Sequence, residues 1–491
     1  MSEVVLENEM ELPKGWIKST LDELIIFKIG GDWGSSSTEE LSSEHAIVNV
    51  LRSTELKNWA IEKGKTAESR IIKKSSLEKR KLVNGDIILE VSGGSSTFSV
   101  GRTVLIDQSV IDNFKNPIIC SNFFRKISFS QFLDSKYIKY SLDYLYSIGV
   151  TRQHKTQTVN IQNLNVKEYI STEIPIPPLN EQKQIVEKID ELFSKINFQI
   201  KTINKTTALL KSNKKSILRD GFNGNLTKIW RETHKLKKSE TLLEKIEEER
   251  KIKNLEKFTR YSSIIPSNFE NDWNVSVLGF VTENHDGRRI PVSKIKRKDM
   301  KGDYPYYGAS GIIDYVNKPL FKGKHLLIGE DGANLLARST PIAFIADGEF
   351  WVNNHAHILT TLGGIPLNFV SYFINSIDLS EWITGTAQPK LNQRNMNKIP
   401  IPIPSIEEQI EIVKIIEQNI SLIDQQLEFL KIWNLTLIKL KTSILKKTFE
   451  GKLVPQDPTD EHAEILFQKI KQEKKLLLQK QKIKRRGKNV K

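Results

Sequence analysis

The stretch Ile174-Pro-Ile-Pro-Pro-Leu-Asn-Glu-Gln182 returns 227 residues later as Ile401-Pro-Ile-Pro-Ser-Ile-Glu-Glu-Gln409. At the same offset, Phe222-Asn-Gly-Asn-Leu226 returns as Phe449-Glu-Gly-Lys-Leu453, and nothing is inserted between the two pairs. A repeat of this length is far too long to be the unit of a solenoid. It predicts a chain of two halves, each with its own globular block followed by a helix that both halves share.

Residues from Leu179 to Asp220 are predicted to form one long helix. Pro177 and Pro178 precede it, and Asn180 is the expected N-cap. Gly224 follows the end of the helix, where a left-handed residue commonly stops one. About 42 residues at 1.5 Å each give a rod of roughly 60 Å.

Both copies of this helix carry Ile or Leu at every seventh position. The positions are Ile189, Ile196, Ile203, Leu210 and Ile217 in the first copy, and Ile416, Ile423, Leu430, Leu437 and Ile444 in the second. A stripe this narrow suits one partner helix better than a globular core. We therefore predict an intrachain coiled coil of two antiparallel helices, related by a pseudo-twofold internal repeat, with Ile203 near Leu430.

The repeat also predicts the domain organisation. We expect a first globular domain at residues 1–173, a helix and polar connector at 174–263, a second globular domain at 264–400, and a C-terminal helix with a basic tail at 401–491. Short β-type runs in the first block precede a segment of helical spacing at Phe132–Leu145. The runs are Ala46–Leu51, Asp86–Val91, Ser99–Ile106 and Ile118–Ile127. The predicted fold class is α+β, with two globular α/β domains separated by the two long helices.

Weaker parallels extend the repeat beyond the helices. They pair Leu242–Arg250 with Leu466–Lys474, Leu327–Gly332 with Leu89–Gly94, and Gly385–Asn392 with Gly149–Lys155. These pairs indicate that both halves share a common structural frame, meaning the same helices and strands, and that each half carries a different surface on it.

Composition narrows the class of protein. The net charge is +15, but the nine Lys and Arg residues of 474–491 carry much of it, which leaves 15 − 9 = +6 for the rest of the chain. We expect that tail to be a frayed, solvated end. Cys120 is the only cysteine, which excludes an internal disulfide and a multi-thiolate zinc site. The start of the chain lacks the features of a signal peptide and no apolar run reaches the length of a membrane span, so a cytoplasmic protein is expected.

Four motifs in the second block add specificity to this pattern. They are Tyr304-Pro-Tyr-Tyr-Gly-Ala-Ser-Gly311, Gly329-Glu-Asp-Gly-Ala-Asn334, Trp351-Val-Asn-Asn-His-Ala-His357 and Gly385-Thr-Ala-Gln-Pro-Lys-Leu-Asn392. With the duplicated helix boundaries, these motifs make nearly the whole chain resemble the specificity subunits of type I restriction-modification enzymes.

This resemblance implies a non-catalytic DNA-binding subunit. In that family, two target recognition domains each read one half of a split, asymmetric site in double-stranded DNA, and the helix pair sets the spacer. Two methyltransferase subunits dock on the helices and a motor-nuclease subunit joins them. S-adenosylmethionine, ATP and magnesium would belong to those partners, and no cofactor is expected in this chain.

Two other functions are compatible with the residues. One is a self-sufficient DNA methyltransferase or nuclease. Asn116-Pro-Ile-Ile119 lacks the aromatic residue of an adenine methyltransferase, and the lysine of a nuclease-like Glu181-Gln-Lys183 is absent from its repeat, Glu408-Gln-Ile410. The other is a coiled-coil assembly protein that binds no DNA.

Candidate DNA-binding residues are of two kinds. Side chains able to contact bases or phosphates are Arg152, Gln153, Lys155, Arg288, Arg289, Gln388 and Lys390. Residues that allow close backbone approach or sit beside such a loop are Gly93, Gly94, Ser95 and Asn334. Solvated loops and tight turns are the alternative interpretation of both sets.

A metal site is not expected. His355 and His357 would share one face of a strand, with Asp331 as a third ligand in principle. Two histidines without a firm third ligand fall short of a site. A hydrogen-bonded structural cluster is the preferred interpretation.

Overall fold

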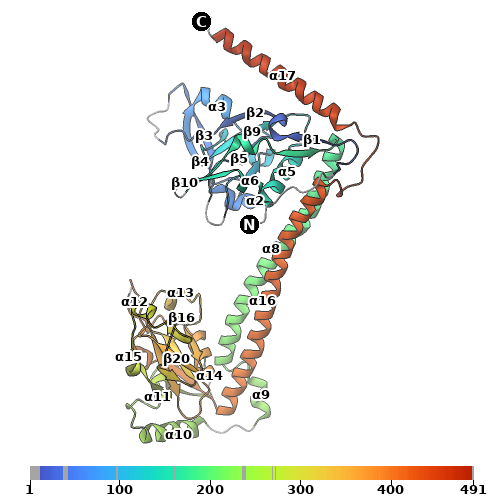
Figure 1. Ribbon diagram of the computed structural model, residues 1–491. Coiled ribbons are helices and arrows are strands. Elements are labelled where there is room, and N and C mark those ends of the chain that lie inside the picture. Colours follow the sequence, from blue (N-terminus) through green and yellow to red (C-terminus); the bar gives the residue numbers. More distant parts are fainter. Residues whose placement is uncertain are drawn as a thin grey trace. The chain divides into compact units, whose positions relative to one another are not determined.

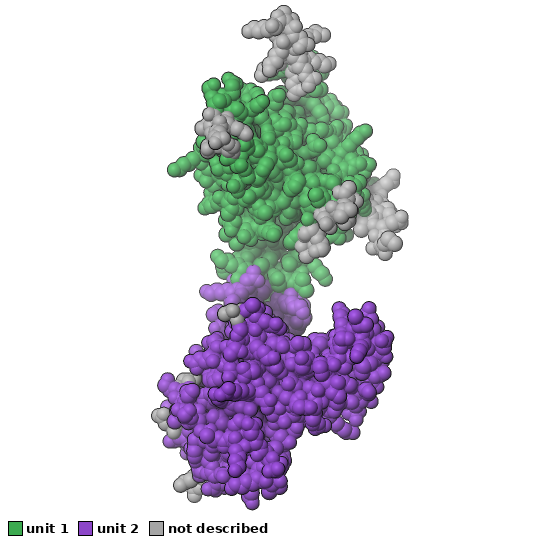
Figure 2. Space-filling model, turned by 90° about the vertical axis from the view of Figure 1, so that its left-hand side faces the viewer, with its two compact units in different colours: residues 1–201, 433–491 green, residues 202–432 purple. Residues whose placement is uncertain are grey.

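The computed structural model describes residues 11–488, except 37–41, 95–97, 159–160, 235–238, 268, 271 and 386. The candidate residue Ser95 lies outside the described residues. The chain forms two compact units, residues 1–201 with 433–491 and residues 202–432 (Figure 2). No described helix is both long enough and apolar enough to cross a membrane.

Unit 1 contains the first globular domain, an α+β fold of short strands. Its strands are β1 (Ile17–Thr20), β2 (Ile25–Gly30), β3 (His45–Leu51), β4 (Glu68–Lys73), β5 (Ile87–Glu90), β6 (Ser92–Gly93), β7 (Thr103–Leu105), β8 (Ile118–Cys120), β9 (Phe124–Phe129), β10 (Lys155–Thr158), β11 (Ile161–Leu164) and β12 (Glu173–Ile176). Its helices are α1 (Leu21–Leu24), η2 (Glu55–Asn58), α2 (Trp59–Glu62), α3 (Lys74–Arg80), α4 (Gln108–Ile111), α5 (Ser135–Ser147), α6 (Val150–Gln153), α7 (Val166–Tyr169) and α17 (Ala463–Lys488). The predicted run Ile118–Ile127 is broken into two strands, because the chain turns at Ser121–Phe123.

Unit 2 contains the second globular domain. Its strands are β13 (Asn274–Val277), β14 (Thr282–Asn284), β15 (Tyr304–Gly308), β16 (Gly311–Val316), β17 (Phe321–Lys322), β18 (His325–Gly329), β19 (Ala343–Ala346), β20 (Glu349–Val352), β21 (Ala356–Thr361) and β22 (Pro400–Ile403). Its helices are α9 (Lys228–Thr233), α10 (Ser239–Ile252), α11 (Leu278–Val281), η3 (Asp286–Arg288), α12 (Lys294–Lys298), α13 (Asn334–Ala337), α14 (Leu367–Ser376) and α15 (Gln393–Met396).

The two domains share one strand topology. The sheet β2-β9-β5-β7 in the first domain has the order of β14-β21-β18-β19 in the second. A parallel pair, β3 with β8, corresponds to β15 with β20. In each domain the first strand pairs antiparallel with the last, so that Ile17 faces Ile176 and Asn274 faces Ile403. The predicted α+β class and duplicated frame are confirmed.

The long helices α8 (Leu179–Phe222) and α16 (Ile406–Phe449) pack together and are antiparallel (Figure 1). In unit 1, Lys441 Nζ donates to Asn197 Oδ1 at 2.6 Å. In unit 2, Lys214 Nζ pairs with Asp424 Oδ1 at 2.8 Å. The two contacts are copies of each other, because Asn197 and Asp424, like Lys214 and Lys441, are 227 residues apart.

The predicted apolar stripe lies in this seam. Eight of its ten residues are buried, and Leu210 and Leu430 are half-buried. The expected contact between Ile203 and Leu430 stays a prediction. Lys441 Nζ lies over the ring of Phe193 as well as beside Asn197, one turn further along α8, so the lysine contacts fix the register only to within about a turn.

The Glu-Gln pair at the start of each long helix joins that helix to its globular domain. Trp16 Nε1 donates to Glu181 Oε2 at 2.8 Å, and Trp273 Nε1 donates to Glu408 Oε2 at 3.0 Å. All four side chains are buried. The expected N-cap role of Asn180 is wrong, because α8 already begins at Leu179 and the amide of Asn180 donates to Asp460 instead.

The two helix starts differ in their second carboxylate oxygen. Glu408 Oε1 accepts from Thr227 Oγ1 and from Arg231 Nη1, both at 2.7 Å. Glu181 Oε1 is buried and has no hydrogen-bond partner in the described part of the chain. Burial therefore raises the pKa of Glu181 above its ordinary value, although the hydrogen bond from Trp16 opposes the shift.

The connector repeat is confirmed in both units. Leu242, Leu243 and Ile246 of α10 are buried, and their counterparts Leu466, Phe467 and Ile470 of α17 are buried as well. The expectation of a frayed C-terminal tail is wrong for its backbone. Helix α17 continues through Lys488, and Lys474 Nζ donates to the carbonyl of Asp22 at 2.5 Å.

Glu181→Gln tests the unpaired carboxylate at the start of α8. Because the folded-state pKa of Glu181 is raised, its contribution to stability is present at low pH and is lost as pH rises through that pKa. The glutamine keeps an acceptor for Trp16 and does not ionise. The melting temperature of E181Q relative to wild type should therefore rise between about pH 4 and pH 7.

Glu408→Gln is the matched control. It removes one of the two charge partners of Arg231, the other being Glu270, and should lower the melting temperature at neutral pH. If E181Q and E408Q gave the same change, the asymmetry between the two helix starts would be refuted.

Candidate nucleic-acid interface

The described candidates of the first domain gather around one three-stranded ribbon, in the order β10-β11-β6. Gly93 and Ser92 of β6 face Gln162 and Asn163 of β11. Gly94 has a φ of +76°, which favours glycine, and a Cβ there would lie 3.1 Å from Gln162 Oε1. A small residue is therefore required where the chain leaves β6.

Helix α6 supplies the other candidates of the first domain. It leads directly into β10, and Arg152 and Gln153 at its end are exposed. Lys155 is the first residue of β10 and is half-buried. A cationic and an amide side chain thus lie at the base of the ribbon, where each could reach a phosphate or a base edge.

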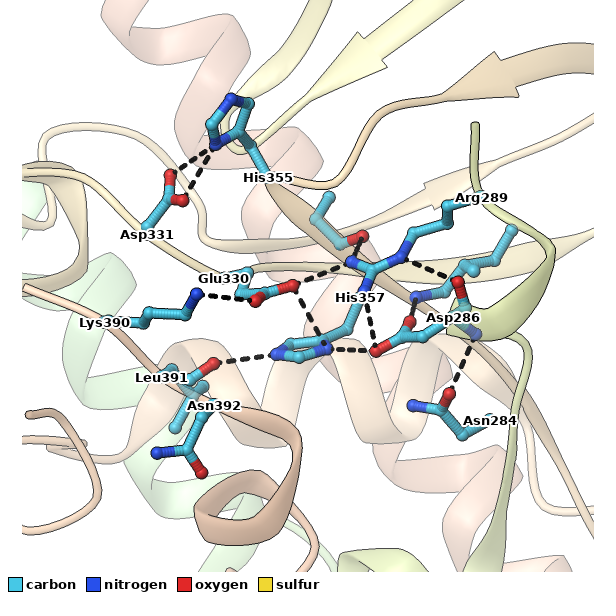
Figure 3. A network of polar contacts seen from close by, with 12 residues as sticks. Asn284, Asp286, Arg289, Glu330, Asp331, His355, His357, Lys390, Leu391 and Asn392 are labelled. Carbon is cyan, nitrogen blue, oxygen red and sulfur yellow. Dashed lines mark hydrogen bonds and ion pairs between the residues drawn. The ribbon is translucent and has the colours of Figure 1, made fainter. Parts of the chain in front are cut away.

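A buried polar cluster organises the corresponding face of the second domain (Figure 3). Arg289 Nη1 donates to Glu330 Oε2 at 2.8 Å and to the carbonyl of Ala356 at 2.7 Å. His357 lies 2.5 Å from Asp286 through Nδ1 and 2.7 Å from the carbonyl of Leu391 through Nε2. Both neighbours are hydrogen-bond acceptors, so each ring nitrogen of His357 faces an oxygen.

The carboxylates of this cluster are held in their charged form. Burial opposes ionisation of Asp286, but the hydrogen bond from His357 and the nearby Arg289 keep its pKa below its ordinary value. Burial likewise opposes ionisation of Glu330, and Arg289, His357 and Lys390 keep its pKa below its ordinary value. The cluster is a network of ion pairs that fixes the strand ends around it.

Asp286, Glu330 and His357 are also close enough to be considered as metal ligands, with ligand atoms within 4.8 Å of one another. The guanidinium of Arg289 already occupies this space, 2.8 Å from Glu330 and 3.3 Å from Asp286. A divalent cation would therefore have to displace existing charge partners. The geometry favours the hydrogen-bonded cluster over a metal centre.

The exposed candidates of the second domain surround this cluster. Lys390 is half-exposed and pairs with Glu330 at 3.2 Å, and Gln388 beside it is exposed. His355 pairs with Asp331 at 2.8 Å through Nδ1. Arg288 is exposed and its guanidinium lies 4.9 Å from the centre of the Phe321 ring. These side chains come from three loops that the buried cluster ties together.

Two candidates have structural roles that the sequence did not reveal. Arg289 is mostly buried, with its guanidinium bound by carboxylates. Asn334 organises its own loop, since its amide oxygen accepts from Ser339 and Thr340 and its amide nitrogen donates to Thr340. Neither side chain is presented to solvent in the way that Lys390 is.

Comparison with known proteins agrees with this arrangement. The family model "type I restriction modification DNA specificity domain" matches residues 13–208 and 270–430. These segments cover most of the chain, including both globular domains and much of both long helices.

The chain belongs to this family.

Individual relatives are more distant. A putative type I restriction enzyme specificity subunit of Haemophilus influenzae is 36% identical over 129 residues, which are 26% of this chain and 32% of that protein. The putative type I restriction enzyme MjaX specificity subunit of Methanocaldococcus jannaschii is 23% identical over 462 residues, or 90% of this chain and 95% of that one. A solved chain described under complex assembly and conformational transition of the type I R-M system has a TM-score of 0.58 at 16% identity, covering 90% and 99%.

Coverage differs among the curated relatives. This chain matches only 32% and 34% of the length of the first two, whereas the archaeal relative is matched nearly end to end. The likeness to the solved chain supports the mixed helix and strand fold described above.

Backbone contacts correct two of the expected parallels between the two domains. Leu164 N donates to the carbonyl of Val91, and Leu391 N donates to the carbonyl of Glu330. Gly385–Asn392 therefore corresponds to residues 158–165, and its pairing with Gly149–Lys155 is wrong. The pairing of Leu327 with Leu89 is also off by one residue. Because Val91 and Glu330 are equivalent, Leu89 corresponds to Ile328.

Sequence reasoning consequently missed three residues of the first domain. Asn163 is the counterpart of Lys390, and Ser92 is the counterpart of Asp331, since each pair is bridged in the same way. Phe123 is the counterpart of His355. The offset of 227, already visible in the long helices, leads from Lys390 to Asn163 and was the available signal.

Arg289→Ala tests the structural role of the buried cluster. The substitution leaves Glu330 and Asp286 without their guanidinium and should cost on the order of 3 kcal/mol of unfolding free energy. Arg288→Ala removes only an exposed cation near Phe321 and should cost less than about 1 kcal/mol. Denaturant unfolding of the two variants measures the difference. Equal losses would show that the cluster does not hold the domain.

Proposed function

We propose that this chain is the specificity subunit of a type I restriction-modification complex and that it recognises a bipartite, asymmetric site in double-stranded DNA. Each globular domain reads one half of the site. The observation that carries the proposal is the duplicated frame with two chemically different exposed surfaces. A protein that needed only one surface, or two equal ones, would not diverge at these loops while keeping the strands and helix starts.

The surfaces have the chemistry that base recognition needs. The first domain offers Arg152, Gln153 and Asn163 around its ribbon, and the second offers Gln388 and Lys390 above its buried cluster. Arginine and lysine pair with guanine, and asparagine and glutamine pair with adenine. The different sets favour different half-sites, which makes the whole site asymmetric.

The helix pair is proposed to set the spacer between the half-sites. Each long helix has 44 residues, or about 66 Å at 1.5 Å per residue. That length corresponds to roughly 19 base pairs, or nearly two helical turns, so the two domains would contact the same face of the DNA. Eight of the ten stripe residues in the seam are buried, which supports a fixed spacer.

The proposed partners are two methyltransferase subunits and a motor-nuclease subunit. A duplicated frame gives two equivalent places for two copies of one partner. S-adenosylmethionine, ATP and magnesium are assigned to those subunits, and this chain supplies recognition. If the chain were instead a self-sufficient methyltransferase or nuclease, the purified chain alone would modify or cut DNA when S-adenosylmethionine and magnesium were added.

Co-expression with the partner methyltransferase, followed by mapping of methylated bases, tests this function. The expected result is one methylated motif of two defined parts separated by a fixed, unspecified spacer. A motif with a single continuous part, or activity of the purified chain alone, would contradict the proposal. Failure of the loaded complex to bind duplex DNA in a salt-dependent way would favour an assembly protein.

Lys390→Ala provides a sharper test within the same assay. Removing the ammonium should reduce discrimination at one base pair of one half-site by roughly tenfold, and the other half-site should be unchanged. Lys322→Ala is the matched control, because Lys322 is also a lysine of the second domain and its side chain is 83% exposed on β17. Equal relaxation of both half-sites would refute the assignment of one half to each domain.

A further inference from the structure

The turn before the central strand has the same construction in both domains. In the first, Ser121–Phe123 connects β8 to β9, and in the second Asn353–His355 connects β20 to β21. Ser121 N donates to the carbonyl of Leu51 at 2.9 Å, and Asn353 N donates to the carbonyl of Tyr307 at 3.1 Å. The two turns therefore leave the parallel strand pair at the same point.

The tip of each turn is fixed by a second shared contact. The carbonyl of Phe123 accepts from Val91 N at 2.8 Å, and the carbonyl of His355 accepts from Glu330 N at 2.9 Å. Because Val91 and Glu330 are equivalent, Phe123 and His355 occupy the same backbone position. A side chain on a turn held by strand hydrogen bonds is presented in a defined direction.

Both tip side chains are large and half-exposed, but their chemistry differs. Phe123 is 47% exposed, and the side chain of His355 is 48% exposed. A phenyl ring half in water forgoes burial that stabilises most phenylalanines by about 1.5–3 kcal/mol. About half of the Phe123 side chain is therefore left accessible to a further contact.

The surroundings of each tip are the candidate recognition residues. Phe123 O also accepts from Ser92 N at 3.2 Å, and Ser92 Oγ donates to Asn163 Oδ1 at 2.7 Å. His355 Nδ1 lies 2.8 Å from Asp331, whose backbone forms a bridge with Lys390. Each tip is thus the third member of an equivalent trio, with Ser92 and Asn163 in the first domain and Asp331 and Lys390 in the second.

We infer that Phe123 and His355 are equivalent specificity-determining residues, each contacting base pairs of the half-site that its domain reads. The inference rests on the proposed function and names the position through which the shared frame reads different sequences. Ser92 with Asn163, and Asp331 with Lys390, flank that contact.

The two tips would read DNA by different chemistry. Phe123 has no polar atom in its side chain, so it contacts the methyl group of thymine or stacks against an opened base step. His355 uses Nδ1 toward Asp331, and no described residue is hydrogen-bonded to its Nε2. That nitrogen is available for a hydrogen bond with a base edge. The same backbone position therefore gives apolar recognition in one half-site and polar recognition in the other.

The test uses the complex of the full chain with its methyltransferase subunit. Phe123→Ala and His355→Ala are compared with wild type by mapping methylated bases and by methylation rates on single-substitution sites. F123A should reduce discrimination at one base pair of one half-site by about tenfold, and H355A should do so in the other half-site only. Phe123→Leu, which keeps an apolar side chain, should retain most of the discrimination.

Val83→Ala is the matched control for Phe123. Val83 is also 47% exposed. It precedes the Ile87 end of β5, whereas Phe124, next to Phe123, pairs with Glu90 at the other end of that strand. V83A should leave the motif and the rates unchanged. Melting temperatures of all variants should match wild type, since each altered side chain is half-exposed.

The outcomes separate the inference from the function on which it rests. A bipartite motif in wild type with no change in F123A and H355A would overturn the inference and leave the function standing. Relaxation of the same half-site by both variants would overturn the equivalence of the two tips. Absence of any bipartite motif in wild type would overturn the proposed function itself.

Discussion

A buried indole that donates to a buried carboxylate joins each globular domain to its long helix. Trp16 with Glu181, and Trp273 with Glu408, make this contact at 2.8 and 3.0 Å. The contact lies where the first and last strands of each domain pair, so it fixes both ends of the domain against the start of the helix. A hydrogen bond to a buried charged group is expensive to break. The position of each globular domain relative to its own helix depends on it.

The rest of the frame repeats around this contact. The same seven-residue stripe closes the helix seam, and the lysine contacts to Asn197 and Asp424 occur at equivalent positions. Helices α10 and α17 cover their domains with equivalent apolar residues. Where the copies differ in the frame, the difference has a physical consequence. Arg231 satisfies Glu408, whereas no described group satisfies the second oxygen of Glu181.

Much of this frame could be predicted from the sequence, because it depends on periodicity. The helix at Leu179–Asp220, its end before Gly224 and its pairing with the second copy follow from a repeat and a stripe. The antiparallel direction was inferred from the globular block between the two copies. The recognition surfaces were harder to predict. Arg288 and Arg289 are adjacent in sequence, yet one is exposed and the other is held by Asp286 and Glu330. Only the fold brings those carboxylates to one of them. Phe123 was missed because an exposed phenylalanine resembles a core residue in sequence.

Family membership, the shared strand topology and the divergent loops lead to one account. A single frame occurs twice in the chain, and each copy includes one of the two antiparallel long helices. The two copies of the frame carry different residues at the trios of Ser92, Phe123 and Asn163, and of Asp331, His355 and Lys390. On the proposed function, stability and recognition are separated: the indole contacts, the seam and the buried ion pairs hold the fold, and the exposed trios are free to change.

The most direct measurement of this account is the methylation motif of a chain with two copies of the first domain. In that chain Trp16–Glu173 replaces Trp273–Pro400, and residues 463–476 of α17 replace residues 239–252 of α10. The account predicts a motif made of the first half-site and its reverse complement, because the helices that carry the two copies are antiparallel. A direct repeat of the first half-site, or a motif that still contains the second half-site, would contradict it.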